Sequence, residues 1–353
     1  MLQLEVQERD GAARFGVGLR HDVADAVREL GATRALVLST PNQCDTALET
    51  ASDLGDLAAG IFSKAAMHTP VDVTEAALTN MRELNADCVV AVGGGSTTGL
   101  GKALAYRTGI HQVVIPTTYA GSEATPILGQ TENGLKTTLT DPKVAPDVVL
   151  YDPELIQSLP IPMTVTSALN AMAHAAEALY APNRTDHTDA LARRGFEAFA
   201  KGLPAVLKEP RNLTARLETQ RGAWACGRVL GLVGMALHHK LCHTLGGSFG
   251  LPHAETHAII LPHAIAYNAR SAAYELTPIT DILGGESPGQ ALYDFANRMG
   301  APLALKDLGL NEADLEKAAS LAVQKPYPNP HPVTEADILA LLRAAWAGKA
   351  PAF

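Results

Sequence analysis

Charged residues are scarce in this chain, and basic ones are scarcer than acidic ones. Asp, Glu, Lys and Arg make up 18% of the 353 residues, and 28 Lys and Arg against 37 Asp and Glu give a formal net charge of −9. No run of basic residues occurs, so the electrostatic footprint of a nucleic-acid-binding protein is missing. We expect no nucleic-acid partner, and an anionic small molecule would need locally placed donors.

Long apolar runs are also missing, although 47% of the residues are hydrophobic. No stretch approaches the roughly 18 apolar residues that span a bilayer, and residues 1–15 alternate apolar and charged residues instead of forming a signal peptide. The four cysteines show no CxxC spacing, which favours free thiols in a reducing compartment. We therefore expect a cytoplasmic globular protein with no membrane partner.

The first half of the chain predicts a doubly wound α/β domain. The whole chain, at 353 residues, is longer than one compact core usually holds, which suggests two domains. Short β-branched runs, each closed by a turn signal, alternate with amphipathic stretches such as 71–84. Uninterrupted runs of this kind are typical of parallel strands buried on both faces. The expected strands are 35–38, 88–92, 113–115 and 148–151.

After about Pro160 the sequence becomes rich in Ala and Leu, which favours helices. We expect an α/β domain over 1–157, followed by an all-helical domain over 158–353. The predicted helical segments are 165–180, 187–207, 213–244, 288–299, 312–323 and 334–347.

A glycine-rich turn at 93–99 follows one predicted strand and opens a helix. Glycines let a backbone approach a phosphate closely, and the first N–H groups of the helix complete an anion site. The turn matches neither GxGxxG, because Thr98 replaces the last glycine, nor a Walker loop, because Ala103 follows Lys102. Phosphate binding is favoured over a simple tight turn.

A second polar loop, residues 117–125, follows the next strand. In open α/β sheets ligands bind outside the carboxyl ends of the strands, so two such loops indicate one ligand. The alternative is a solvated loop whose hydroxyls make turn hydrogen bonds.

A set of histidines with one asparagine is spaced for a shared site. Two pairs stand four residues apart, which places each pair on one helical face. Imidazoles in apolar helices need partners, and a common site would supply them. The set comprises Asn170, His174, His239, His243, His253, His257 and His263.

A tightly held metal is not expected at this site. Three histidines, His174, His239 and His253, could serve as nitrogen ligands, and the natural fourth position is Asn170. An amide there lacks the negative charge of a carboxylate beside a dication, a loss of several kcal/mol in a low-dielectric site.

Together these motifs resemble the iron-containing alcohol dehydrogenase family. The resemblance rests on the GGGS turn, the Pro-Thr-Thr loop, residues 135–155 and residues 239–262. It implies a dehydroquinate synthase-like fold with an N-terminal NAD(P)-binding domain, and a metal held by Asp and three His at the positions of Asn170, His174, His239 and His253. The implied cofactor contacts are Ser39, Thr40, His68, Gly94, Gly95, Ser96, Thr117, Thr118, Thr125, Lys136 and Leu155.

The departures from the family pattern indicate a subgroup. Asn170 and Gly99 each replace an Asp, Tyr119–Glu123 replaces a longer loop, and His-Thr-Pro at 68–70 replaces Asn-Pro. This combination resembles enzymes that reduce the C=C bond of maleylacetate to 3-oxoadipate in aromatic-compound catabolism, without an essential metal. The resemblance implies NADH, with NADPH possible because no Asp accompanies Ser39 and Thr40, a dicarboxylate enone substrate and a homodimer.

Without a metal, imidazoles would stabilise the enolate that hydride addition produces. We expect His243, His253, His174 and His239 to be catalytic, with His243 as the first choice of proton donor because it lies one turn beyond His239. The alternatives are a metal-dependent alcohol dehydrogenase that uses Asn170 as a ligand, a lyase like 3-dehydroquinate synthase, and a non-enzymatic nucleotide-binding module.

Overall fold

The structure is a computed structural model that describes residues 4–8, 11–132 and 134–351, with the main chain alone at 4–8, 11, 12 and 136. The chain forms two compact units, each described here by itself. The α/β unit comprises Met1–Leu159 and Arg211–Gln220, and the helical unit comprises Pro160–Pro210 and Arg221–Phe353. The domain boundary after residue 157 remains a proposal.

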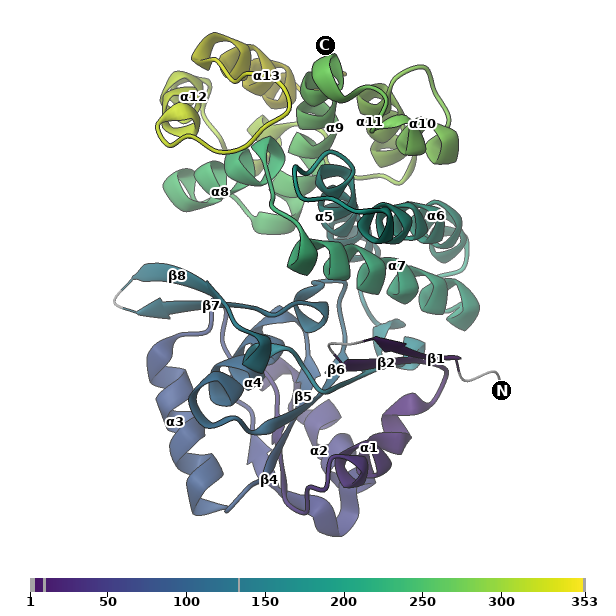
Figure 1. The fold of residues 1–353 in the computed structure, drawn as a ribbon, viewed down its shortest axis with the longest axis vertical. Helices are drawn as coiled ribbons and strands as arrows, with labels where there is room; N and C mark the ends of the chain where they lie inside the picture. Colours follow the sequence, from purple (N-terminus) through teal and green to yellow (C-terminus); the bar gives the residue numbers. More distant parts are fainter. Residues whose placement is uncertain (1–3, 9–10, 133, 352–353) are drawn as a thin grey trace. The chain divides into compact units, whose positions relative to one another are not determined.

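In the described part of the chain, the α/β unit contains a seven-stranded sheet in the order β1-β2-β9-β6-β5-β3-β4 (Figure 1). β1 pairs antiparallel with β2, and the other neighbours are parallel. The predicted strands correspond to β3, β5, β6 and β9, whereas β1, β2 and β4 were not predicted. The bounds are β1 Leu4–Glu8, β2 Gly11–Phe15, β3 Ala35–Leu38, β4 Ala58–Phe62, β5 Cys88–Gly93, β6 His111–Pro116 and β9 Val148–Tyr151.

Helices cover both faces of this sheet, which explains the uninterrupted apolar strands. Val37 and Val90 pack in one buried cluster with residues of α1 (Val23–Glu29) and α2 (Cys44–Leu54). The adjacent residues Leu38 and Ala91 lie beneath α4 (Gly95–Thr108), where a Cβ on Gly101 would contact both. α3 (Val71–Glu83) packs beside α4. Every residue of β3 and β5 is buried as a result.

The helical unit matches most of the predicted segments, with one correction. The segment 213–244 is not continuous, because α7 ends at Leu232 and α8 begins at Leu237. Residues 233–236 separate the two helices, and a carboxylate on α5 caps the start of α8, as described below. The bounds are α5 Ile161–Ala178, α6 Asp186–Lys208, α7 Leu213–Leu232, α8 Leu237–Phe249, α9 His253–Ala272, α10 Thr277–Leu283, α11 Pro288–Arg298, α12 Leu315–Val323 and α13 Glu335–Ala347.

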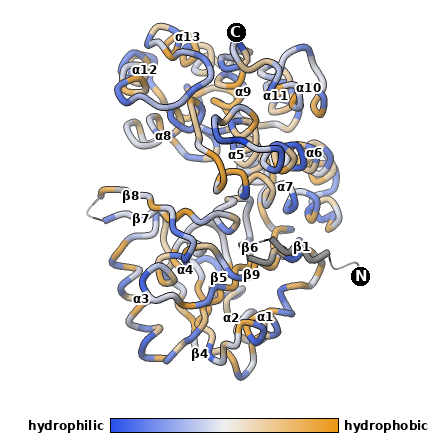
Figure 2. Tube along the Cα trace, in the orientation of Figure 1, coloured by the Kyte–Doolittle hydropathy of each residue, from blue (hydrophilic) through white to orange (hydrophobic). Residues whose placement is uncertain are grey.

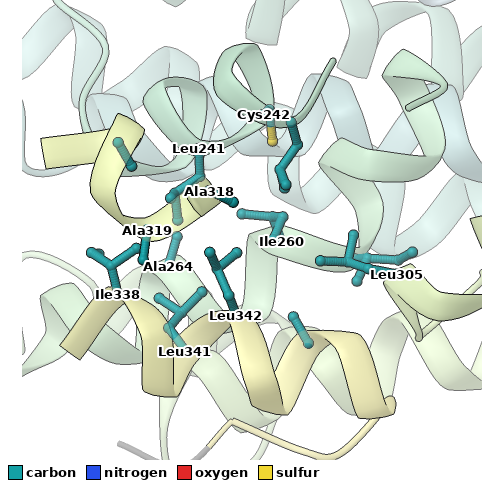
Figure 3. Close-up of a cluster of buried hydrophobic side chains, with 14 of the residues drawn as sticks. Leu241, Cys242, Ile260, Ala264, Leu305, Ala318, Ala319, Ile338, Leu341 and Leu342 are labelled. Carbon is teal, nitrogen blue, oxygen red and sulfur yellow. The ribbon is translucent and has the colours of Figure 1, made fainter. Parts of the chain in front are cut away.

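One buried cluster of the helical unit lies among α8, α9, α12 and α13. Figure 3 shows Leu241 and Cys242 of α8 facing Ile260 of α9 and Leu342 of α13. α9 is buried throughout residues 256–268, and most of its residues there are apolar; the exceptions are the buried polar residues Thr256, His257, His263 and Asn268. In contrast, hydrophobic and hydrophilic colours alternate around α6, which has one exposed face (Figure 2). No described helix is both long and apolar enough to cross a bilayer.

Candidate functional site

The glycine turn after β5 has the shape of a phosphate cradle. A Cβ on Gly93 would lie 2.4 Å from Thr97 Oγ1, and one on Gly94 would lie 3.0 Å from Thr118. Only glycine therefore fits this turn without displacing its neighbours. Gly94 is the N-cap of α4 and no side chain caps the helix there. The N-terminal N–H groups of α4 and its positive dipole end suit the pyrophosphate of a dinucleotide.

A strained turn lies against the same helix. His68 has φ 65° and Thr69 has φ 48°, a left-handed conformation that is costly for a β-branched residue. A Cβ on residue 99 would lie 2.3 Å from Thr69 Oγ1, so Gly99 is required by this turn. The turn thus places His68, an expected cofactor contact, beside α4.

Lys102 holds the polar loop that follows β6. Its ammonium is fully buried and donates to the carbonyl oxygens of Ser122 at 2.5 Å, Thr125 at 2.7 Å and Ile127 at 2.9 Å. Burial lowers the pKa of Lys102 to about 7, and the nearby carboxylate of Glu123 opposes that shift. Thr125 Oγ1 also accepts from this ammonium at 3.0 Å. Lys102 and Thr125 therefore shape the loop from within.

Hydrogen bonds through Gln43 join two of the other expected cofactor residues, Thr40 and Thr117, at neighbouring strand ends. Gln43 Nε2 donates to Thr117 Oγ1 at 2.8 Å, and Thr40 donates to Gln43 Oε1 at 3.2 Å. The buried Ser39 hydroxyl donates to Ser63 at 2.8 Å. Gln43 was not predicted, although it directly follows the turn after β3. The structure groups Ser39, Thr40, Gly94, Gly95, Ser96, Thr117 and Thr118 at the ends of β3, β5 and β6.

Two expected cofactor residues stand apart from this network. Leu155 lies in the turn of 3₁₀-helix Pro153–Ile156 after β9, where it packs against the core. Lys136 is in β8 (Leu135–Thr140), and its side chain lies outside the described residues. β8 pairs with β7 (Ile127–Glu132) as a separate hairpin.

Six of the singled-out histidines and their neighbour His238 come from three helices of the helical unit. α8 carries His238, His239 and His243, α9 carries His253, His257 and His263, and α5 carries His174. The ring centroids of His174 and His239 lie 5.1 Å apart and stacked, those of His239 and His243 6.0 Å apart, and those of His253 and His257 4.2 Å apart. The predicted grouping of His174, His239, His243, His253 and His257 is thus a single cluster, and His263 is buried further along α9.

The cluster divides into buried and exposed imidazoles. His174 and His239 are 4% and 7% exposed, whereas His243 and His253 are exposed to solvent. Burial lowers the pKa of His174 well below its usual value, and the imidazoles of His239, His253 and His243 lower it further. Burial likewise lowers the pKa of His238 and His257, with neighbouring imidazoles adding to the effect. These three buried rings are neutral at pH 7.

Glu177 is a site residue that the sequence analysis missed. It is fully buried on α5, and its Oε2 lies 2.7 Å from His239 Nδ1. The same carboxylate accepts from the backbone N–H of Ala236 at 2.9 Å and of His238 at 2.7 Å, so it caps the start of α8. Its position three residues after His174 and seven after Asn170, on the same helical face, was the available signal.

The family's metal-ligand positions carry three histidines and one amide in this chain, with no carboxylate among them. Asn170 supplies a neutral amide, and its Oδ1, His174 Nδ1 and His239 Nε2 are buried without a protein hydrogen-bond partner. These orphaned atoms can meet a substrate, but they offer a dication no charge. Among the described residues, His174, His239 and His253 do not form a group whose ligand atoms all lie within 4.8 Å of one another.

Another buried trio, His238, Cys242 and His257, does bring its ligand atoms within 4.8 Å of one another. However, His238 Nε2 and His257 Nδ1 already share a hydrogen bond at 3.0 Å, and Cys242 Sγ lies 3.7 Å from the same nitrogen. Burial raises the pKa of the Cys242 thiol well above its usual value, with the Glu177 charge adding to it. The three side chains therefore satisfy one another only in part, because His238 Nδ1 and His257 Nε2 are buried without a hydrogen-bond partner in the described protein.

Comparison with known proteins gives consistent matches over the chain. The family model "Iron-containing alcohol dehydrogenase" matches residues 11–153, and the model of the C-terminal part of the same family matches residues 164–346. A maleylacetate reductase of Rhizobium sp. (strain MTP-10005) is 56% identical over 96% of each chain.

Solved structures agree with those matches. A crystal structure of maleylacetate reductase from Agrobacterium tumefaciens superposes with a TM-score of 0.96 at 53% identity, covering 99% of this chain and 100% of that one. An iron-containing alcohol dehydrogenase from Corynebacterium glutamicum superposes with a TM-score of 0.93 at 36% identity, covering 100% and 99%. The expected fold class, a parallel nucleotide-binding sheet followed by helices as in dehydroquinate synthase, is confirmed.

Proposed function

Because the chain belongs to the iron-containing alcohol dehydrogenase family, we propose that this oxidoreductase uses NADH to reduce the C=C bond of maleylacetate to 3-oxoadipate. The observation that carries the proposal is its 56% identity, over 96% of both chains, to a protein named maleylacetate reductase. The histidine cluster with Asn170 at the ligand position supports the same chemistry. NADPH is a second possible donor, since no acidic residue accompanies Ser39 and Thr40 after β3.

The α/β unit binds the nucleotide in this proposal. The glycine turn and the N-terminus of α4 hold the pyrophosphate, and the hydroxyls of Thr117 and Thr118 lie at the end of the neighbouring strand. His68 is the proposed contact from the strained turn. When bound, NADH supplies the hydride that adds to the alkene carbon β to the ketone.

The helical unit stabilises the product of that addition. As the C–H bond forms at the β carbon, the alkene π pair becomes the double bond between the α carbon and the carbonyl carbon. The carbonyl π pair moves onto the ketone oxygen and gives an enolate. His174 and His239 offer their orphaned ring nitrogens to this oxygen or to the neighbouring carboxylate. A proton delivered to the α carbon then restores the ketone and completes the reduction.

His243 is the proposed proton donor, with His253 as the next candidate. Both rings are exposed to solvent, so either can be reprotonated after each turnover. His174 is less suited to this task, because burial and its neighbours hold it neutral. His239 is buried like His174, and its ring centroid lies 6.0 Å from that of the exposed His243.

We propose further that no metal is essential. The support is the chemistry of the donor set: Asn170 brings an amide where a dication needs a charge. The resemblance to the family also supports a cytoplasmic homodimer, which light scattering on the purified protein would test.

The decisive experiment follows NADH oxidation with maleylacetate, and with a panel of simple aldehydes and ketones, in the presence of a chelator. We expect maleylacetate to be reduced with undiminished activity. Activity with aldehydes alone, or activity that falls with the chelator and returns with iron or zinc, would overturn the proposal. NADH that is not consumed at all would instead favour a lyase.

A further inference from the structure

The proposed substrate is a dianion, whereas the chain has a formal net charge of −9. Taking a carboxylate out of water costs free energy unless a cation or several hydrogen-bond donors meet it. Lysine and arginine are the side chains with a lasting positive charge. The three helices that carry the histidine cluster, α5, α8 and α9, contain two such residues, Lys240 and Arg270.

Arg270 is unsuited to this task by its position and by its pairing. It stands near the C-terminal end of α9, about 25 Å along the helix axis from His253, which begins the same helix. Its Nη1 lies 3.9 Å from Asp337 Oδ1, so its charge is already matched. Lys240 is therefore the cation of these three helices that lies beside the histidines.

Lys240 shares the accessible face of α8 with the proposed proton donor. It stands three residues before His243, and side chains at that spacing are neighbours on a helix. Lys240 is partly exposed and His243 is exposed, whereas the opposite face of α8 is buried in the cluster with α9, α12 and α13. In the part of the chain that the structure describes, no carboxylate pairs with the Lys240 ammonium.

An aromatic ring lies beneath this ammonium. Lys240 Nζ is 5.9 Å from the centroid of the Tyr327 ring, a cation–π contact that leaves the N–H donors of the ammonium available. Tyr327 in turn packs against the buried cluster that contains Leu241. A lysine side chain loses rotamer entropy when it binds an anion, and a ring that already holds the side chain reduces that loss.

The segment that carries the ring, residues 325–330, is itself fixed. Prolines alternate with the other residues of this segment and restrict its backbone. The side-chain amides of Asn329 and Asn268 of α9 exchange two hydrogen bonds, at 2.6 Å and 2.9 Å. Asn329 Oδ1 also accepts from the backbone N–H of Leu237 at 3.4 Å. The ring is thus anchored to the first turn of α8, which also carries Lys240.

We propose that Lys240 binds one of the two substrate carboxylates and so selects a dicarboxylate, with Tyr327 as the residue that positions it. The charge and the three N–H donors of an ammonium suit a carboxylate oxygen. This inference rests on the proposed function for the identity of the substrate, but not for the binding of a dicarboxylate.

The first test is isothermal titration calorimetry of the full chain in the presence of NAD⁺. The probes are adipate, a stable dicarboxylate with the chain length of the substrate, and hexanoate, its monocarboxylate counterpart. We expect the wild-type protein to prefer adipate, and Lys240→Met to bind adipate about 10- to 100-fold more weakly. Lys240→Arg, which keeps the charge, should keep the preference.

Two results would overturn the proposal. One is equal affinity for adipate in the wild-type protein and in Lys240→Met. The other is a wild-type protein that binds adipate no more tightly than hexanoate, a result that does not depend on any variant. Lys325, exposed two residues before Tyr327, is the competing cation. Weaker adipate binding in Lys325→Met, with none in Lys240→Met, would assign the carboxylate to Lys325 instead.

Steady-state kinetics provide the second test. Lys240→Met should raise KM for maleylacetate by about the same factor as the loss of adipate affinity and leave KM for NADH unchanged. Lys317→Met is the matched control, because Lys317 Nζ of α12 lies 5.8 Å from the ring centroid of Phe249, at the other end of α8. It removes the same charge and the same kind of contact, and it should change neither KM. An equal rise in both variants would contradict the proposal.

The part played by the ring is tested separately. Tyr327→Leu should raise KM for maleylacetate about 2- to 5-fold, the range for loss of a cation–π contact, whereas Tyr327→Phe keeps the ring and should keep KM. The same KM in these two variants would remove Tyr327 as the positioning residue. If the wild-type protein fails to reduce maleylacetate, the proposed function fails, while the calorimetry with adipate still decides the part played by Lys240.

Discussion

Solvent access distinguishes the histidines of the cluster from one another. His174 and His239 are buried, whereas His243 is exposed on the same helix as His239, one turn further along. A proton donor must recover its proton in every cycle, and an exposed ring does this directly from water. Polarising the ketone requires no such exchange, so buried rings can perform it.

His243→Ala should therefore lower kcat by about 10²- to 10⁴-fold, the range for loss of a general acid, with KM for NADH little changed. Steady-state kinetics with maleylacetate would measure this, and His187→Ala, at an exposed histidine of α6, is the control. Turnover near that of the wild type would remove His243 from the mechanism.

Gly99 and Thr69 lie close enough together that substitutions at the two positions should affect each other. A Cβ at position 99 would lie 2.3 Å from Thr69 Oγ1 but 3.6 Å from Thr69 Cβ. Gly99→Ala should lower the free energy of unfolding by about 1–2 kcal/mol and raise KM for NADH, because the strained turn must move. Adding Thr69→Ala should restore both, and Gly101→Ala, whose Cβ would lie no closer than 3.4 Å to any neighbour, is the control. Additive losses in the double variant would contradict this coupling.

At the scale of elements, one lysine organises the loop between β6 and β7. Three carbonyl oxygens, from Ser122, Thr125 and Ile127, converge on Lys102, and Glu123 lies buried nearby with the Tyr151 hydroxyl 3.1 Å away. The Thr125 hydroxyl faces the same ammonium, at 3.0 Å. Lys102 thereby fixes the loop that follows Thr117 and Thr118.

Lys102→Met should leave those carbonyls without a donor and cost about 3 kcal/mol of stability. We also expect a higher KM for NADH, because the loop no longer holds its shape. Urea unfolding and steady-state kinetics would measure the two effects. Lys143→Met, at an exposed lysine, should change neither, and an unchanged KM in Lys102→Met would separate the loop from cofactor binding.

The elements differ in how far sequence could predict them. β3 and β5 were predictable because burial on both faces leaves an apolar run, whereas Gly60 interrupts β4, the strand at the sheet edge. Gly234 was a local signal for the break between α7 and α8, whereas the carboxylate that caps α8 lies some sixty residues earlier and could not be identified from local residues. The clustering of His174, His239 and His253 was predictable from spacing, but the partner of His239 needed three-dimensional contacts.

At the scale of the whole molecule, the buried histidines make stability depend on pH. Burial lowers the pKa of His263 to about 4, and the pKa values of His174, His238 and His257 are lowered as well. Between about pH 6.5 and pH 4 the unfolded chain therefore binds more protons than the folded one. Stability is fully present above this window and falls as the pH drops through it.

We expect the free energy of unfolding to fall from pH 7 to pH 5, with about 2 kcal/mol of the fall due to His263. His263→Leu, which replaces the ring with a side chain that does not titrate, should show a fall smaller by that amount. Urea unfolding at the two pH values measures it. An identical fall in both proteins would show that His263 does not contribute.

The α/β unit is completed by a stretch from the other half of the chain, residues 211–220. Thr219 Oγ1 lies 2.6 Å from the Tyr119 hydroxyl, Gln220 Nε2 donates to the Asp152 carbonyl at 3.1 Å, and the fully buried Arg216 donates to the Leu159 carbonyl at 3.3 Å. A fragment cut after Leu159 would lose all three partners. The α/β unit therefore cannot be exchanged as one continuous segment. Chimaeras with related dehydrogenases must carry residues 1–159 and 211–220 together.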